Sequence, residues 1–370
     1  MRTHCLLVSF TLTALFSAGS TFGADPRLMN LVMPDATSVA GVNVTNAKNS
    51  PFGQYVLTGL TSSMSQQMQA FVTATGFDPR QDVTEIVAAS SATAANPSGL
   101  VLALGNFPVA QMTSAITAKS AQLTVQTYGG ATLITGGDAK SSFSVAFLGT
   151  TISAAGDTAS VKAAIDRSMG VNSINPALAT QVQALSTTND AWAVTTSSAS
   201  ALLAGLDVGI GTGGPGSTGG AAPAGPMGQF GQMFNSIQGS SGGIQFGTTV
   251  NITGQAITTD AASAKSLADV MTALVSIASM AGTGATGPAG GQNQQFAAIA
   301  QLLQGLKVTA SGATINLALS VPEATLESFV NSMKAQTAKP AGAVPASRPA
   351  NVPKASVTPS AGSSSAVAAK

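Results

Sequence analysis

The sequence predicts an α+β protein of two tandem related modules, each an antiparallel sheet with helices on one face. Three observations predict it. Period-2 strand patterns and period-3.6 helix patterns alternate along the chain. The first half opens in the order β-α-β-β-α-β, which is the split β-α-β unit of ferredoxin-like folds. Similar elements then recur about 150 residues further on, a domain-sized spacing that indicates an internal duplication.

The first segment, residues 1–24, has the features of a secretory signal peptide. Arg2 precedes an apolar stretch at 6–16, and small residues follow as far as Ala24. The apolar stretch is shorter than the roughly 20 residues of a membrane-spanning helix, which favours cleavage near Gly23 or Ala24. An uncleaved membrane anchor is the alternative. The sequence therefore predicts an exported protein, periplasmic or extracellular.

Module 1, residues 25–172, follows the signal peptide. Apolar residues spaced three and four apart in 51–74 make one face of a long helix, and Asp157 is placed to cap a later one. Residues 150–154 extend the sixth strand or add another. The expected strands are 39–44, 83–90, 99–104, 122–128, 131–135 and 143–148, and the expected helices are 51–74, 108–119 and 157–169.

Module 2, residues 173–337, repeats this plan with two Gly-rich insertions, 209–227 and 282–291. Such runs bury too little apolar surface to offset their ordering entropy, and the same composition predicts a disordered Pro/Ala/Ser tail at 338–370. The expected strands are 191–196, 243–250, 251–258, 306–310 and 313–321, and the expected helices are 198–206, 227–237, 260–280, 294–303 and 322–334.

Composition limits the kinds of catalytic, metal and cofactor sites that the exported part can contain. Removing the signal peptide removes His4 and Cys5, the chain's one histidine and one cysteine. Their loss excludes His- or Cys-dependent nucleophilic sites, zinc sites built on them, haem with a His ligand and iron–sulfur clusters, so no cofactor is predicted. Charged residues make up 8% and the net charge is +1, which gives no attraction for nucleic acid or anionic lipid. No transmembrane helix is expected after signal cleavage.

Two glycine motifs lack the flanking strands and helices that their usual functions require. The G-x-G-x-x-G match at 209–214 is followed by Pro215, so no helix begins there to bind a dinucleotide phosphate. The G-x-S-x-G match at 239–243 is preceded by an expected helix and followed by a strand, the reverse of a nucleophile elbow. We therefore interpret 239–243 as a helix-terminating turn.

Asp78, Asp82 and Glu85 form the densest acidic cluster and are the candidate metal ligands. A Ca²⁺ loop needs oxygen ligands at regular spacing around a central glycine, and Pro79 and Arg80 fit that pattern poorly. A structural role is therefore favoured for the cluster. No catalytic or cofactor-binding residue is predicted.

Residues 76–83 (GFDPRQDV), the strand-to-helix joins and the closing segment 308–323 resemble exported bacterial proteins of unknown function built from duplicated α+β modules. The resemblance covers roughly 36–334. Its motifs are structural, so it implies a fold but no activity and no functional residue.

The first functional hypothesis is an exported, non-enzymatic binding or scaffold protein of the bacterial envelope. Its partner would be an envelope component or a protein, held on a sheet face or in the cleft between modules. One alternative is an extracytoplasmic hydrolase using carboxylates or Ser/Lys, which two acids about 5 to 9 Å apart in a walled cleft would favour. Another is a self-associating surface protein, because sparse charge gives little repulsion between copies.

Overall fold

The computed structural model describes residues 23–62, 65–91, 98–119, 122–137, 142–170, 172, 174–198, 236–284, 305–328 and 331. The strands are β1 (Ser38–Asn43), β2 (Val83–Ser91), β3 (Ser98–Gly105), β4 (Thr124–Tyr128), β5 (Ala131–Gly136), β6 (Phe143–Leu148), β7 (Ile152–Asp157), β8 (Ala191–Thr195), β9 (Ile237–Gln245), β10 (Thr249–Thr258), β11 (Lys307–Ser311) and β12 (Thr314–Pro322).

The helices among these residues are α1 (Pro26–Met29), α2 (Val44–Asn49), α3 (Pro51–Ser62), α4 (Ser65–Thr75), α5 (Pro79–Asp82), α6 (Val109–Lys119), α7 (Thr158–Ser168), α8 (Pro176–Ser186) and α11 (Ala261–Gly284). A short helical segment also follows β12 at 323–328. The predicted insertion 209–227 and tail 338–370 lie outside the described residues. The second insertion begins later than predicted, because α11 continues to Gly284.

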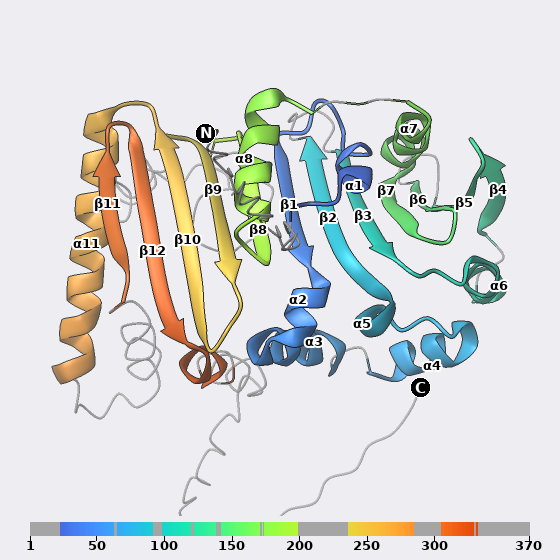
Figure 1. Cartoon of the computed structure of the whole chain (residues 1–370), viewed down its shortest axis with the longest axis horizontal. Coiled ribbons are helices and arrows are strands. Elements are labelled where there is room, and N and C mark those ends of the chain that lie inside the picture. The colour runs from blue at the N-terminus through green and yellow to red at the C-terminus, as the bar shows by residue number, and fades with distance from the viewer. Residues whose placement is uncertain are drawn as a thin grey trace, which may run out of the picture.

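The strands form one continuous twelve-stranded sheet in the order β11-β12-β10-β9-β8-β1-β2-β3-β7-β6-β5-β4 (Figure 1). Every neighbouring pair is antiparallel. The predicted α+β class with an antiparallel sheet is therefore confirmed. No helix in the described part of the chain is both long and apolar enough to cross a membrane.

The arrangement of strands corrects the ferredoxin-like expectation. The element order β-α-β-β-α-β is present, but a split β-α-β unit needs two parallel strands flanking a third. Here the helices α2 to α5 return the chain antiparallel beside β1, which pairs with β2 from Ser38↔Ser90 to Asn43↔Glu85. The other edge of β1 is occupied by β8, from Ser38↔Thr195 to Val42↔Ala191. The first three strands therefore form a meander.

The pairing of β1 with β8 also joins the two predicted sheets into one. Outward from this junction the order is β1-β2-β3-β7-β6-β5-β4 on one side and β8-β9-β10-β12-β11 on the other. Both series place the first three strands in chain order and the remaining strands in reverse chain order. The duplication itself stays a prediction.

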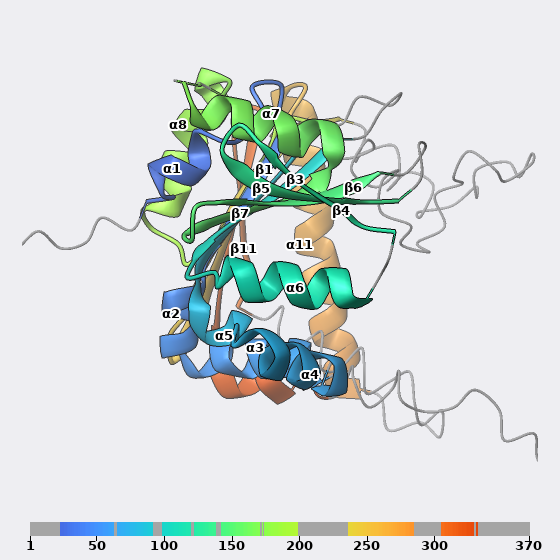
Figure 2. The same cartoon turned by 90° about the vertical axis from the view of Figure 1, so that its right-hand side faces the viewer.

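Helices cover both faces of the sheet, which corrects the expectation of one face. We call the face under α1, α7 and α8 the front face and the other the back face. Figure 2 shows α7 and α6 on opposite sides of β4 to β7, and α1 and α8 on the opposite side of the sheet from α11. The cause is that successive residues of a strand, whose side chains point to opposite faces of the sheet, are both apolar. On β2, Val87 belongs to the front core and Ile86 packs against the back core.

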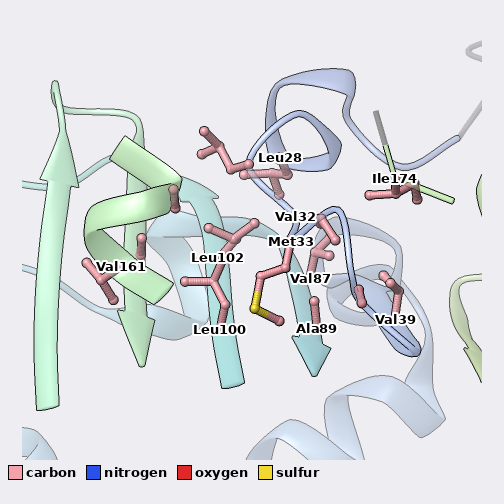
Figure 3. Packing of buried hydrophobic residues seen from close by; sticks show 14 of the residues in the cluster. Leu28, Val32, Met33, Val39, Val87, Ala89, Leu100, Leu102, Val161 and Ile174 are labelled. Atoms are coloured by element: carbon pink, nitrogen blue, oxygen red, sulfur yellow. The ribbon is translucent and has the colours of Figure 1, made fainter. Parts of the chain in front are cut away.

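The front core joins α1 and the segment after it to β1, β2 and β3. Leu28, Val32 and Met33 point toward the strand residues Val87 and Leu102 (Figure 3), and all five side chains are buried. Burying a side chain of this size contributes about 1.5–3 kcal/mol. The residues just after the expected signal peptide are therefore part of the folded body.

The second half of the sheet is covered differently on its two faces. On the back face α11 packs through Leu267 and Ala264 onto Ile315. On the front face, β10 and β12 present Thr253, Gln255 and other polar side chains that no described helix covers. Among the described residues, this half of the sheet therefore has an uncovered polar face beside α8, which we call the open polar face.

Candidate functional site

α8 crosses the front face over β8 and β9, at the junction of the two halves of the sheet (Figure 1). The Asn175 side chain caps it by accepting from the Ala177 N–H at 2.9 Å, and Pro176 fills the first turn. Leu178 and Val182 are buried beneath it. The cap and the buried side chains hold α8 against the sheet, and a hollow lies at its C-terminal end.

This hollow, the polar basin, has a volume of about 410 Å³. It lies between the C-terminal end of α8, the start of β8 and the turn between β9 and β10. Its lining consists of Asn46, residues 187–190, residues 245–249 and Asn251. All of these side chains are neutral except the carboxylate of Asp190.

Asp190 uses both carboxylate oxygens to connect the two halves of the protein. Oδ1 accepts from Asn46 Nδ2 at 2.7 Å, and Oδ2 accepts from the Phe246 N–H at 2.6 Å. Its backbone carbonyl accepts from the Asn43 N–H at 2.7 Å and its own N–H donates to the Ile244 carbonyl at 2.9 Å. Hydrogen bonds to a charged acceptor are stronger than neutral ones, so Asp190 fixes the floor of the basin.

Neutral side chains form the rest of the wall. Asn189 Nδ2 donates to the Leu185 carbonyl and to Thr188 Oγ1, both at 2.9 Å. Gln245 Nε2 donates to the Thr188 carbonyl at 2.5 Å. Gly243 leaves the space that Asn189 occupies, because a Cβ there would overlap the amide of that side chain. The basin thus offers amide and hydroxyl groups held in place by the backbone.

An aromatic edge borders the same hollow. The Phe246 ring lies 6.3 Å from Phe52, which lies 6.3 Å from Tyr55 in the same helix, α3. Phe246 is partly exposed within the lining. The arrangement can hydrogen-bond a polar ligand and contact its apolar side, whereas it contains no pairing of a nucleophile with a base.

Three further hollows carry no carboxylate in their linings. A groove of about 360 Å³ runs between α8 and the open polar face, at Gln181 and Gln255. A hollow of about 710 Å³ lies between α1 and α8 at Met29, and one of about 410 Å³ lies on the back face at Ala88. Two of the three therefore also border α8.

The structure separates the three candidate metal ligands. Asp78 forms an ion pair with Arg80 at 2.8 Å, and the hydrogen bond from Arg80 is the main cause that lowers the pKa of Asp78. Asp82 Oδ2 accepts from the Asp78 N–H at 2.7 Å, so these two acids are neighbours. Glu85 instead accepts from the Asp25 N–H on the front face. No three His, Cys, Asp or Glu side chains of the described residues are placed to hold a metal ion.

A register shift in the pairing of β2 with β3, between Val83 and Glu85, is the cause of that separation. Val83 packs into the back core, and the irregular register at this point turns Glu85 to the front. Lys48 Nζ occupies the space near the other two acids, donating to the Gln81 and Val83 carbonyls at 2.9 and 2.7 Å. Burial lowers the pKa of Lys48.

Sequence reasoning missed α8 and with it the basin. The signal was present: Asn175-Pro176 is a cap followed by a first-turn proline, and Leu178, Val182 and Leu185 have helical spacing. The segment 239–243 was interpreted as a turn but lies within β9. Its glycines fit a strand because Gly242 faces the Thr253 carbonyl too closely for a Cβ.

Fold and site together define an α+β protein with an extended antiparallel sheet and a polar recess, containing one carboxylate, at the junction of its two halves. No known protein family and no curated protein matches the chain. Among solved structures it is similar to TP0453, at 10% identity. Crystal forms I, III and IV give TM-scores of 0.43, 0.46 and 0.47, covering 84%, 82% and 82% of this chain and 98%, 97% and 95% of that one.

Proposed function

We propose that this protein is an exported, non-enzymatic binding protein of the bacterial envelope. Its contact site is the polar basin, and its ligand is an uncharged chain rich in hydroxyl and amide groups, of the kind found in N-acetylated glycans. The observation that carries this proposal is the chemistry of the lining: amides and hydroxyls surround one carboxylate whose two oxygens are both already occupied.

The chemistry of such a ligand matches this lining. Sugar hydroxyls donate and accept hydrogen bonds, and Asn, Gln and Thr side chains supply both functions. The partly exposed Phe246 gives the apolar side of a sugar ring a surface to contact. A volume of about 410 Å³ lies within the range of small-ligand sites.

The geometry favours binding over hydrolysis. A carboxylate hydrolase needs two acids facing each other across a walled cleft. Of the four hollows described above, three have no acid in the lining and the basin has Asp190 alone. Asp78 and Asp82, the neighbouring acids, border none of the four.

The test uses the mature protein with chitotetraose, a neutral tetramer of N-acetylglucosamine, in isothermal titration calorimetry. We expect saturable binding, and we expect Thr249→Arg to weaken it at least tenfold by filling the basin. Thr309→Arg, an equally exposed threonine on β11 outside the four hollows, is the matched control and should bind like the wild type. Absence of binding by the wild type, or equal loss in both variants, contradicts the proposal.

A second candidate function, self-association, is favoured by the free edge of the sheet at β4. Residues 124–127 are exposed, carry no charge and pair with β5 alone among the described strands. Such an edge is a template for pairing with another copy.

Sedimentation velocity at rising protein concentration tests this second function. We expect Val125→Lys on β4 to keep the protein monomeric. Val101→Lys is the matched control, because Val101 is as exposed but lies on the interior strand β3, and it should associate like the wild type. A wild-type monomer at every concentration excludes the self-association.

A further inference from the structure

Glu85 holds the start of the described chain against the sheet. It lies on β2, partly buried, and its two carboxylate oxygens both accept from the backbone N–H of Asp25, at 3.1 and 3.2 Å. The two residues are 60 positions apart in sequence. One peptide N–H thus faces both oxygens of a carboxylate.

This carboxylate lacks a cationic partner among the described residues. The ion pairs there are Arg27–Asp25, Arg80–Asp78 and Lys265–Asp269. Arg27, whose charge acts on Glu85, is held by Asp25 through Nη2–Oδ2 at 2.8 Å and Nε–Oδ1 at 3.1 Å. Burial is the largest cause and raises the pKa of Glu85. The hydrogen bond from the Asp25 N–H, next in size, lowers this pKa, the Asp25 carboxylate raises it, and Arg27 has the smallest, lowering effect. A partly buried charge facing only a neutral donor is poorly compensated.

The Asp25 N–H, which donates to Glu85, lies at the predicted cleavage site of the signal peptide. Hydrolysis of the Ala24–Asp25 bond consumes one water, leaves a carboxylate on the departing signal peptide and turns the Asp25 amide into a protonated α-amino group. Cleavage at Gly23–Ala24 places that group one residue earlier. In either case a positive charge is created within one residue of the nitrogen that contacts Glu85.

The surrounding contacts fix this end of the chain. Ala24 packs against the front core, and Asp25 caps α1 by accepting from the Arg27 N–H at 2.8 Å. Leu28, which follows directly, is fully buried. The new α-amino group would therefore be held near Glu85 instead of moving freely in solvent.

We propose that Glu85 is the binding site for the mature N-terminus, and that removal of the signal peptide completes the protein by forming an ion pair between the α-ammonium and Glu85. The precursor lacks this pair, so processing fastens α1 to the sheet. The inference depends on export and is independent of what the polar basin binds.

The first measurement is the intact mass of the full-length gene product recovered from the envelope of an exporting bacterium. We expect a chain beginning at Ala24 or Asp25. A chain that retains residues 1–22, or begins beyond residue 25, overturns the proposal and leaves the glycan-binding test unaffected.

The second measurement is a double-mutant cycle on the mature protein. One change is a Gly-Ser extension before the natural first residue, which moves the ammonium away, and the other is Glu85→Gln. We expect the extension to raise the unfolding equilibrium constant about tenfold in the wild type, the change that corresponds to one pKa unit. In Glu85→Gln the extension should have no effect. An equal effect in both backgrounds overturns the proposal.

A third measurement uses only the wild type, so it tests the proposal even if Glu85→Gln does not fold. Reductive ¹³C-methylation of the α-amino group lets NMR follow its titration. We expect the pKa of this group to lie above the ordinary range of about 7.7–8.0, because the neighbouring carboxylate favours the ammonium. An ordinary value shows that the N-terminus is free in solvent and overturns the proposal.

Discussion

Replacing Asp190 by alanine tests whether this residue connects the two halves of the protein. The change removes the acceptor of two short hydrogen bonds, from Asn46 Nδ2 at 2.7 Å and from the Phe246 N–H at 2.6 Å. A hydrogen bond to a charged group contributes about 1.5–3 kcal/mol when buried. Because both bonds are part-buried, we expect the free energy of unfolding to fall by about 2–4 kcal/mol in total.

The assay is urea unfolding at pH 7 followed by the fluorescence of Trp192, which is buried at the junction two residues after Asp190. Asp269→Ala is the control, because Asp269 forms only an exposed pair with Lys265 and should change stability by less than about 0.5 kcal/mol. If Asp190→Ala lowers the free energy of unfolding no more than that control does, neither the junction nor the floor of the basin depends on the carboxylate.

Three further changes test the core, the junction and the acidic turn. Leu102→Ala should lower the free energy of unfolding by about 2–5 kcal/mol in urea titrations, because the side chain is fully buried; a loss below 1 kcal/mol contradicts the packing. Gly41→Ala should cost about 1–3 kcal/mol and alter Trp192 emission, since a Cβ there overlaps the indole; unchanged emission contradicts this contact. The pKa of Asp78 is lowered by Arg80, so this pair stabilises the fold above the unfolded value of about 3.9 and the stabilisation is lost as the pH falls through the folded value. Asp78→Asn should therefore be less stable than wild type at pH 7 and equal to it near pH 2, measured by thermal unfolding; a constant difference contradicts the ion pair.

Local patterns predicted the individual elements better than their arrangement. The alternation in 39–44 gave β1 to within one residue, and Asp157 caps α7 as expected, accepting from the Ser160 N–H. The expected helix 51–74 corresponds to α3 and α4, with 63–64 outside the described residues, and α2 precedes them with Asn43 as its cap. These patterns are local because a cap or an apolar face involves residues within one or two turns.

The sheet order could not be predicted because it depends on contacts distant in sequence. Nothing within β1 indicates that one edge pairs with β2 and the other with β8. The candidate acids were misplaced for a related reason: spacing puts Asp78, Asp82 and Glu85 together, whereas the register shift after Val83 turns the last of them to the front. The basin was missed because it is assembled from three separate segments.

The central seam of the sheet has a consequence for a shortened chain. The second neighbour of β1, after β2, is β8, which begins at Ala191. A fragment ending at residue 172 would leave Ser38–Val42 as a bare edge. Since β8 runs antiparallel to β1, the β1 of another fragment could take its place around a two-fold axis, satisfying the same backbone groups. The fragment ending at residue 172 should therefore form a two-fold symmetric dimer, in which β1 of each molecule takes the place of β8 beside β1 of the other.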